Sequence, residues 1–349
     1  MQEPRFEITS QILENVGRID AAREMIENAP LVPLWERRFK REAIERTVHY
    51  ATALEGNALN YTEVKEILDK GTEHRVTAGQ RDIQEVINYR KAIEYIDELL
   101  EKDVQIIDEE IVKHLNSLIT DGLIDEDLRG KYREVPAISR NMRTMEKSLD
   151  WPDPQKVPWL MGQLFDWLSG KGREVHPILR AGVIHTWLVL IHPFSEGNGR
   201  TARILSTLSL CLDGYDIRRF FCLEEYYDQD AARYYQAIRA VLDSDGNYTD
   251  WLEYFTTGLA LEFTRVEKRV LDLSRDASLK SSAGQVRLNP RQEKIILFVK
   301  DYGQIKNSDW QELFPDVSDD TILRDIKELV EKGVLVKKGK TKAARYEFS

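Results

Sequence analysis

Apolar residues recur at helical spacing through most of this chain. In residues 8–28, 34–54 and 157–170 they stand three or four positions apart, with charged and polar residues between them. Two further apolar runs, residues 183–191 and 204–211, have the length of buried helices, and a short polar stretch rich in glycine separates them. The pattern therefore predicts a mainly helical protein with a tight loop between two of its buried helices.

Two segments depart from this pattern. Residues 128–155 hold short β-prone pieces between turn residues and predict a hairpin, for which an ordinary surface hairpin is the plain interpretation. Near the end of the chain, residues 274–285 are polar and rich in serine, as in a linker. The residues that follow predict a separate small domain, with three short helices at 290–300, 308–314 and 318–332 and two strands within 334–348.

The composition is that of an ordinary soluble globular protein. The 349 residues leave room for about two domains, and the net charge of −10 argues against general affinity for nucleic acid. Cys211 and Cys222 are the only cysteines, which argues against a disulfide framework or a cysteine zinc site and favours a reducing compartment. No signal-peptide core and no run of roughly 18 apolar residues is present, so we expect a cytoplasmic protein without a membrane segment.

The polar stretch between the two apolar runs, residues 192–203, reads His-Pro-Phe-Ser-Glu-Gly-Asn-Gly-Arg-Thr-Ala-Arg. It leads into a helix N-terminus, where free backbone N–H groups and the helix dipole attract anions. Gly197 and Gly199 let the backbone approach such an anion closely. Arg200 and Arg203, three residues apart, add two guanidinium groups on one helical face. A polyphosphate is the ligand that this pattern favours.

Two more side chains of this loop bring chemistry to the anion. Glu196 offers hard oxygen ligands, and carboxylates beside nucleotide phosphates commonly share Mg²⁺ with them. His192 is the nearby side chain whose ordinary pKa suits proton transfer at neutral pH, although a histidine at a helix end can also serve only as a cap. Together these residues predict a nucleotide-dependent transferase that acts on a hydroxyl.

The order of these residues, His-Pro-Phe-x-Glu-Gly-Asn-Gly-Arg-x-x-Arg, resembles the signature of the Fic family, whose members mostly transfer AMP from ATP to a protein hydroxyl. The resemblance implies a Fic-type helical bundle core with a β-hairpin flap, which residues 128–155 would form beside the target segment. It also implies that His192 takes the proton of the target Ser, Thr or Tyr and that Glu196 holds Mg²⁺. The nucleotide ATP would then bind at Gly197, Asn198, Gly199, Arg200 and Arg203.

Residues 51–56, Ala-Thr-Ala-Leu-Glu-Gly, resemble the end of the inhibitory helix that precedes the core in many Fic proteins. The resemblance implies that Glu55 pairs with Arg203 and keeps the γ-phosphate of ATP from its productive position. Ala51 stands where the family has Ser or Thr, and Thr52 follows one residue later, which leaves the supporting hydroxyl hydrogen bond open. A plain surface role for the Glu55 carboxylate is the alternative.

Residues 223–238 resemble the region of the family that closes over the adenine. Tyr226, Tyr234 and Tyr235 are the candidates for stacking on the base, because aromatic faces suit a nucleobase. Tyrosine pairs on an amphipathic helix are also common core residues, so we expect only some of the three to reach the ligand. His185, within the apolar run, is expected to be a hydrogen-bonded packing residue rather than a metal ligand.

The resemblance divides the chain into four parts: an N-terminal helical region, 1–110, with the inhibitory helix at about 36–56; the Fic core, 111–260; a connecting helix and linker, 261–285; and a winged-helix-like domain, 286–349. The whole predicts AMP transfer from ATP to a protein hydroxyl, inhibited by Glu55. Removal of AMP from a modified protein, with Glu55 activating water, and an ATP-sensing DNA-binding regulator stay open as alternatives. The family also suggests homodimers that modify themselves, whereas the target protein is not readable from the sequence.

The C-terminal part resembles a winged helix-turn-helix module. Cations that suit phosphate contacts with DNA stand on its third helix and on its wing: Arg324, Lys327, Lys338, Lys340, Lys342 and Arg345. Acids near the start of the third helix oppose DNA: Asp319, Asp320 and Asp325. Such modules often contact proteins instead, so DNA and protein partners both stay open for residues 286–349.

Overall fold

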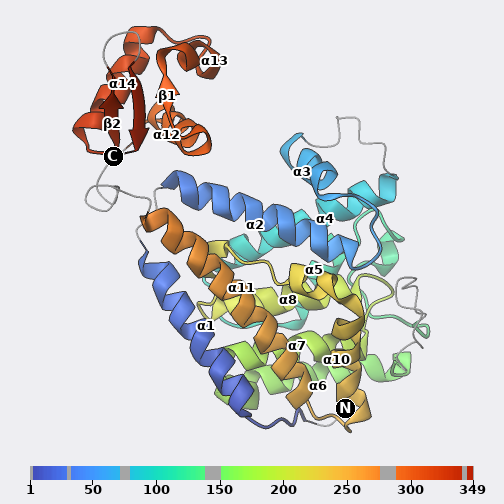
Figure 1. Ribbon diagram of the computed structural model, residues 1–349. Coiled ribbons are helices and arrows are strands. Elements are labelled where there is room, and N and C mark those ends of the chain that lie inside the picture. Colours follow the sequence, from blue (N-terminus) through green and yellow to red (C-terminus); the bar gives the residue numbers. More distant parts are fainter. Residues whose placement is uncertain are drawn as a thin grey trace. The chain divides into compact units, whose positions relative to one another are not determined.

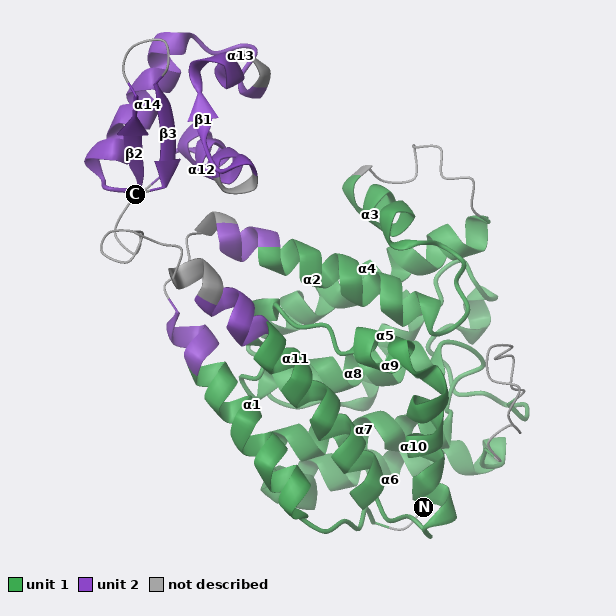
Figure 2. Cartoon of the chain, in the orientation of Figure 1, with its two compact units in different colours: residues 1–24, 39–265 green, residues 25–38, 266–349 purple. Residues whose placement is uncertain are grey.

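The computed structural model describes residues 3–29, 33–70, 79–137, 151–275, 288–339 and 344–348. Over these residues the fold is mainly α, as predicted, with a small antiparallel sheet. Contacts divide the chain into two compact units, residues 1–24 with 39–265 and residues 25–38 with 266–349 (Figure 2). None of the helices that the structure describes is both long enough and apolar enough to cross a membrane.

Helices α1 to α11 follow one another through the first 275 residues (Figure 1). Their bounds are α1 Ser10–Asn28, α2 Pro33–Ala53, α3 Tyr61–Lys70, α4 Gln80–Glu101, α5 Glu109–Ile119, α6 Val157–Ser169, α7 Pro177–Ile191, α8 Asn198–Leu212, α9 Glu224–Gln229, α10 Ala231–Asp243 and α11 Thr249–Arg275. The helices expected from the apolar spacing at 8–28, 34–54 and 157–170 are confirmed as α1, α2 and α6, with ends shifted by a few residues.

Helix α7 forms the centre of the larger unit, because its sequence is apolar on every side and its residues 181–191 are all buried. Helix α8 packs against it, and α4 and α5 pack against α8. Helix α11 comes close to α7 at Gly182, where an added Cβ would lie 2.8 Å from Leu252. The indole of Trp251 donates a hydrogen bond of 2.8 Å to the Gly182 carbonyl. The loop between α7 and α8 is therefore carried by two tightly packed helices.

Part of one predicted feature lies outside the described residues, and the region at 223–238 contains a break. Of the hairpin predicted in residues 128–155, residues 138–150 lie outside the described residues. In the described part, Tyr132 forms an isolated antiparallel bridge with Phe194. The helical region at 223–238 is divided into α9 and α10 at Asp230, whose side chain caps α10 by accepting a hydrogen bond of 3.0 Å from the Arg233 N–H.

The predicted C-terminal helices and strands are also confirmed. They are α12 Pro290–Tyr302, α13 Trp310–Leu313, α14 Asp319–Glu331, β2 Leu335–Lys338 and β3 Arg345–Phe348. The sheet has the order β1-β3-β2 and is antiparallel throughout. Strand β1, Ile305–Lys306, was not expected, because two residues are too short to give an alternating pattern. Lys340 and Lys342, expected on the wing, lie outside the described residues.

Candidate active site

The loop between α7 and α8 is held in one shape by its own residues. Helix α7 ends at Ile191 and is capped by His192, which has a left-handed φ of 52° and donates its N–H to the Leu188 carbonyl at 2.9 Å. Helix α8 begins after Gly197, whose φ of 78° suits glycine. The Asn198 side chain exchanges two hydrogen bonds of 2.8 Å with the backbone of Phe194. The Asn198 amide therefore fixes the shape of the loop and leaves the backbone N–H of Asn198 free to face a ligand.

His192 is arranged as a neutral base. Its Nδ1 lies 3.3 Å from the Val189 carbonyl, which assigns the ring proton to Nδ1 and leaves Nε2 as an acceptor. The ring of Trp151 stacks on the imidazole with 4.0 Å between centroids and 27° between planes. Desolvation, aided by the charge of Arg133, lowers the pKa of His192 to about 4, although the Val189 contact and Glu55 oppose the shift. The imidazole is therefore neutral at pH 7.

Arg133 fixes the His192 end of the loop, and sequence reasoning did not find it. Its buried guanidinium donates to the His192 carbonyl at 2.7 Å and to the Pro152 carbonyl at 2.6 Å. Its backbone N–H donates to the Pro193 carbonyl at 2.8 Å. All of these acceptors are backbone oxygens, which every residue type supplies, so no residue pattern could have indicated the pairing. Trp151 was not predicted for a similar reason, because ring stacking between distant residues has no characteristic spacing in the sequence.

Arg200 and Arg203 are brought together at the first turns of α8, and both are buried, with exposed fractions of 3% and 2%. Among the described residues, the Nε and Nη1 groups of each guanidinium have no well-aligned hydrogen-bond acceptor, although Arg200 Nη1 forms an ion pair with Glu85 at 3.4 Å. Arg203 uses its Nη2 to donate to the Ala51 carbonyl at 3.0 Å and to the Glu55 carboxylate at 2.8 Å. Buried cationic donors without acceptors are costly, so these two groups fit an anionic ligand at the helix N-terminus.

The Glu55 carboxylate lies at this same helix N-terminus. It follows the end of α2, in a turn closed by Gly56 with a φ of 98°. An added Cβ on Gly199 would lie 2.3 Å from Glu55 Oε1, so the carboxylate touches the first turn of α8. Desolvation raises the pKa of Glu55, but the charges of Arg203 and Arg200 outweigh it and hold that pKa below its usual value. An ionised carboxylate therefore stands where an anion would bind.

The hydroxyl of Thr52 does not support this carboxylate. It donates to the Val48 carbonyl at 2.9 Å, within its own helix. Ala51, which replaces the usual hydroxyl residue, contributes its backbone carbonyl to Arg203 instead. Glu55 is thus positioned by the arginine and by the helix terminus.

Glu196 lies on the loop and pairs with two arginines. Arg81 of α4 donates to its Oε1, and Arg200 Nη2 lies 3.5 Å from the same oxygen. The described residues contain no group of three or more His, Cys, Asp or Glu side chains suited to a metal. A single carboxylate next to a phosphate site does fit Mg²⁺, which keeps waters and takes phosphate oxygens as ligands. Arg81 and its neighbour Glu85 were not found from the sequence, because α4 reaches the loop only through the fold.

The three candidate tyrosines are not equivalent. Tyr234 is 1% exposed, its hydroxyl lies 2.8 Å from His185 Nε2, and its ring packs against Trp251. Its ring is therefore enclosed by protein in this structure, and the expectation that only some of the three tyrosines reach the ligand stays a prediction. Tyr226 and Tyr235 keep part of their surface exposed and stay candidates. The buried, hydrogen-bonded His185 is the packing residue that the sequence predicted, and burial holds its pKa well below the usual value.

Comparisons with known proteins match both compact parts of the chain to families. Residues 106–210 match the profile of the Fic/DOC family, and residues 291–340 match that of the DeoR-like helix-turn-helix domain. A protein adenylyltransferase Fic from Nematostella vectensis is 28% identical over 221 residues, which are 62% of this chain and 49% of the relative. Protein adenylyltransferase fic-1 from Caenorhabditis elegans is 30% identical over 185 residues, 51% of this chain and 34% of the relative. The chain thus spans at most about half the length of these relatives.

Solved structures show the same fold. A Fic family protein from Desulfovibrio desulfuricans superposes with a TM-score of 0.69 at 23% identity, over 100% of this chain and 98% of that one. Fic-1 from Caenorhabditis elegans gives a TM-score of 0.60 at 23% identity, over 76% of this chain and 73% of the other. The chain therefore contains a domain of the Fic/DOC family, at residues 106–210, and a DeoR-like helix-turn-helix domain, at residues 291–340.

Proposed function

We propose that this protein transfers AMP from ATP to a protein hydroxyl. The observation that carries the proposal is the pair of buried arginines, Arg200 and Arg203, with unmatched donors at a helix N-terminus beside the neutral imidazole of His192. An anion cradle next to a base suits a reaction in which a hydroxyl attacks a phosphate. Relatives named protein adenylyltransferase support the choice of AMP as the transferred group.

In the proposed mechanism the ATP phosphates lie over the N–H groups of residues 197–199 and between Arg200 and Arg203. The oxygen of a target Ser, Thr or Tyr forms a bond to the α-phosphorus, while the bond to the bridging oxygen of the β-phosphate breaks. Pyrophosphate leaves with that electron pair, and the hydroxyl proton passes to His192 Nε2. Glu196 would hold Mg²⁺, which when bound neutralises charge on the phosphates. Positioning and charge neutralisation supply most of the rate gain.

We infer that Glu55 inhibits this reaction. Its carboxylate holds Arg203 at 2.8 Å and contacts Gly199, so ATP phosphates and Glu55 compete for one position. The protein would then transfer no AMP, even with ATP present, until the turn after α2 moves. Of the four sequence-based regions, the N-terminal one, residues 1–110, supplies this carboxylate to the core at 111–260, while 261–285 and 286–349 have no proposed part in the chemistry.

The test is intact mass spectrometry after incubation with Mg²⁺ and ATP, for the native protein and for Glu55→Gly, each alone and with a cell lysate. We expect Glu55→Gly to add one AMP per modified site, on itself or on a lysate protein. The matched control is Glu55→Gly with His192→Ala, which should add no detectable AMP in the same time. Absence of AMP from every substrate tested with Glu55→Gly would reject the proposed activity.

Two further elements of the proposal concern location and partners. Cys211 and Cys222 are both free and buried, which fits a reducing cytoplasm. A hydroxyl on a second copy of the chain is one candidate substrate, since self-modification needs no further partner. The same mass measurement on the isolated protein distinguishes a self-modified chain from one that modifies only lysate proteins.

DNA binding by residues 286–349 is the second candidate function, favoured by the match to a DeoR-like helix-turn-helix domain. Asp325, expected to oppose DNA from the surface, is 4% exposed and pairs with Arg291 at 2.6 Å, so it does not face a partner. Arg324 and Lys327 are exposed on α14. The wing cations Lys338 and Arg345 are both paired with Glu347, at 2.9 and 2.7 Å.

A mobility shift with duplex DNA tests this second function in the full chain. We expect a shift at low salt that weakens steeply as salt rises, and that Arg324→Glu with Lys327→Glu abolishes. No shift at low salt would leave a protein contact as the role of the domain.

A further inference from the structure

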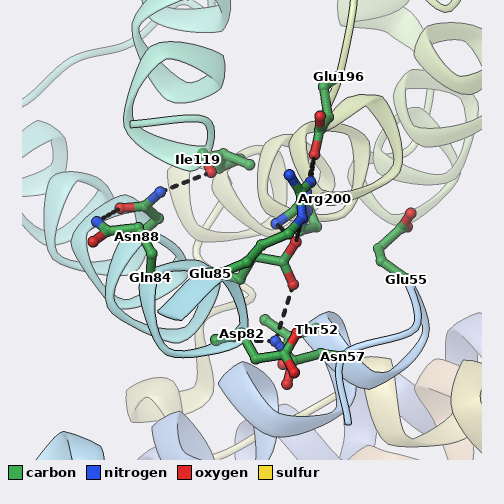
Figure 3. A network of polar contacts seen from close by, with 12 residues as sticks. Thr52, Glu55, Asn57, Asp82, Gln84, Glu85, Asn88, Ile119, Glu196 and Arg200 are labelled. Carbon is green, nitrogen blue, oxygen red and sulfur yellow. Dashed lines mark hydrogen bonds and ion pairs between the residues drawn. The ribbon is translucent and has the colours of Figure 1, made fainter. Parts of the chain in front are cut away.

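Four side chains around the loop form a closed ring of alternating charge. Arg81 and Glu85 come from α4, Glu196 from the loop and Arg200 from α8. Arg81 contacts both carboxylates, Glu196 directly and Glu85 through its Nε at 3.4 Å. Arg200 also contacts both, Glu85 at 3.4 Å and Glu196 at 3.5 Å. Figure 3 shows Arg200 between its two carboxylates, Glu196 on one side and Glu85 on the other.

The ring is buried at one end and open at the other. The exposed fractions of the side chains are 4% for Arg200, 8% for Glu85, 19% for Glu196 and 51% for Arg81. Arg81 is therefore the member that water reaches and that can leave the ring at least cost. Two cations and two carboxylates balance in charge, so the departure of Arg81 leaves one negative charge without a partner.

Glu85 is not the carboxylate that would be released. Its second oxygen accepts a hydrogen bond of 2.9 Å from Asn57, which also donates to the Asp82 carbonyl at 3.0 Å (Figure 3). Asn57 is itself buried, in the turn that follows Glu55. Glu85 therefore stays fixed beside Arg200 when Arg81 moves. The freed charge is that of Glu196, on the side of the loop next to the phosphate site.

We propose that Arg81 is a gating residue for the cation site: in the nucleotide-free protein its guanidinium occupies Glu196 in place of a divalent cation. This inference rests on the proposed function, in which Glu196 holds Mg²⁺ beside the nucleotide phosphates. Mg²⁺ and the Arg81 guanidinium compete for the same carboxylate oxygen, so part of the binding energy of the metal is used to displace Arg81. The gate is distinct from the Glu55 contact, because it acts on the metal carboxylate and not on Arg203.

The size of the effect follows from the exposure of Arg81. An ion pair with one exposed partner contributes little interaction free energy. That energy corresponds to about a twofold to fivefold change in an equilibrium constant. Adding Mg²⁺ should improve nucleotide affinity in both proteins. The improvement should be about twofold to fivefold larger without Arg81 than with it. The native and altered proteins should fold equally well, because Arg81 lies half exposed near the start of α4.

The experiment measures affinity by calorimetry for an ATP analogue with a methylene group between the α- and β-phosphorus, which cannot be cleaved. It compares EDTA with excess MgCl₂ in Glu55→Gly protein, with and without Arg81→Met. The control is Arg90→Met, which removes an arginine of similar exposure on the same helix, paired with Glu94. We expect the gain in affinity on adding MgCl₂ to rise about twofold to fivefold with Arg81→Met and to stay unchanged with Arg90→Met.

A double-mutant cycle with Glu196→Gln completes the test. In that background Arg81→Met should leave the MgCl₂ gain unchanged, because the carboxylate that both cations use is gone. An equal gain with and without Arg81 would overturn the gate while leaving the proposed function standing. An equal loss of affinity in EDTA and in MgCl₂ would also overturn it, since Arg81 would then act on the phosphates. No nucleotide binding under either condition would remove the proposed function and the gate together.

Discussion

Replacement of His192 by alanine is expected to lower the rate of AMP transfer by about 10²- to 10⁴-fold, the usual contribution of a general base. The reason is geometric: its Nε2 is the acceptor left free by the Nδ1 contact with Val189, Trp151 stacks on the ring, and Arg133 holds the backbone carbonyl of His192. The rate is measured as incorporation of labelled AMP in Glu55→Gly protein. His114→Ala, an exposed histidine on α5, is the matched control and should transfer at the full rate. An active His192→Ala protein would show that the hydroxyl loses its proton elsewhere.

The same residue sets an expected pH profile. A base acts in its neutral form, which is present above its pKa, and the pKa of His192 is lowered to about 4. Transfer by Glu55→Gly should therefore stay level between about pH 8 and pH 6 and fall only toward pH 4. Loss of Glu55 extends the level region further into acid, because its charge raises the pKa of His192 in the native protein. A rate that halves near pH 6.5 would mean that the ring titrates like an exposed histidine.

The grouping of the polar side chains of the loop was predictable because these residues are neighbours in the chain. Gly197, Arg200 and Arg203 stand on one short stretch, and helix geometry alone places the two arginines on one face. The pairing of Glu55 with Arg203 was not predictable from spacing, since 148 residues separate them. It entered through the resemblance to a family, and the structure supplies the contact.

The remaining parts of the site arise only from packing. Arg133 and Trp151 act through backbone carbonyls and ring stacking, and Glu85 meets Arg200 because α4 packs against α8. The contact between Tyr234 and His185 is another result of packing, because an amphipathic pattern marks a buried helix face but does not say which side chain that face meets. Sequence patterns therefore predicted the helices and the loop, whereas the contacts that orient the loop come from segments distant in the chain.

Substitution of Glu55 by glycine is expected to raise AMP transfer by about 10- to 100-fold, a size typical of coupling between two ligands that compete for one site. The carboxylate now holds one donor of Arg203 and touches Gly199, so its removal opens both to the ATP phosphates. The buried guanidinium then loses its charged acceptor and keeps only the Ala51 carbonyl, which should cost about 1–3 kcal/mol of folding free energy. Nucleotide should restore that stability, so ATP should raise the melting temperature of Glu55→Gly more than that of the native protein. Differential scanning fluorimetry and labelled AMP incorporation measure the two effects.

Glu55→Gln separates charge from bulk. The amide fills the same space beside Gly199 and still accepts a hydrogen bond from Arg203, but it carries no charge to compete with phosphate. We therefore expect a smaller rise than with glycine. The alternative reaction is removal of AMP by water. Its rate should be highest in the native protein, lower in Glu55→Gln and lowest in Glu55→Gly, because Glu55 would then be needed to activate the water. If Glu55→Gly adds AMP no faster than the native protein yet fails to release AMP from a modified target that the native protein clears, the carboxylate is a catalytic base and the inhibitory role is wrong.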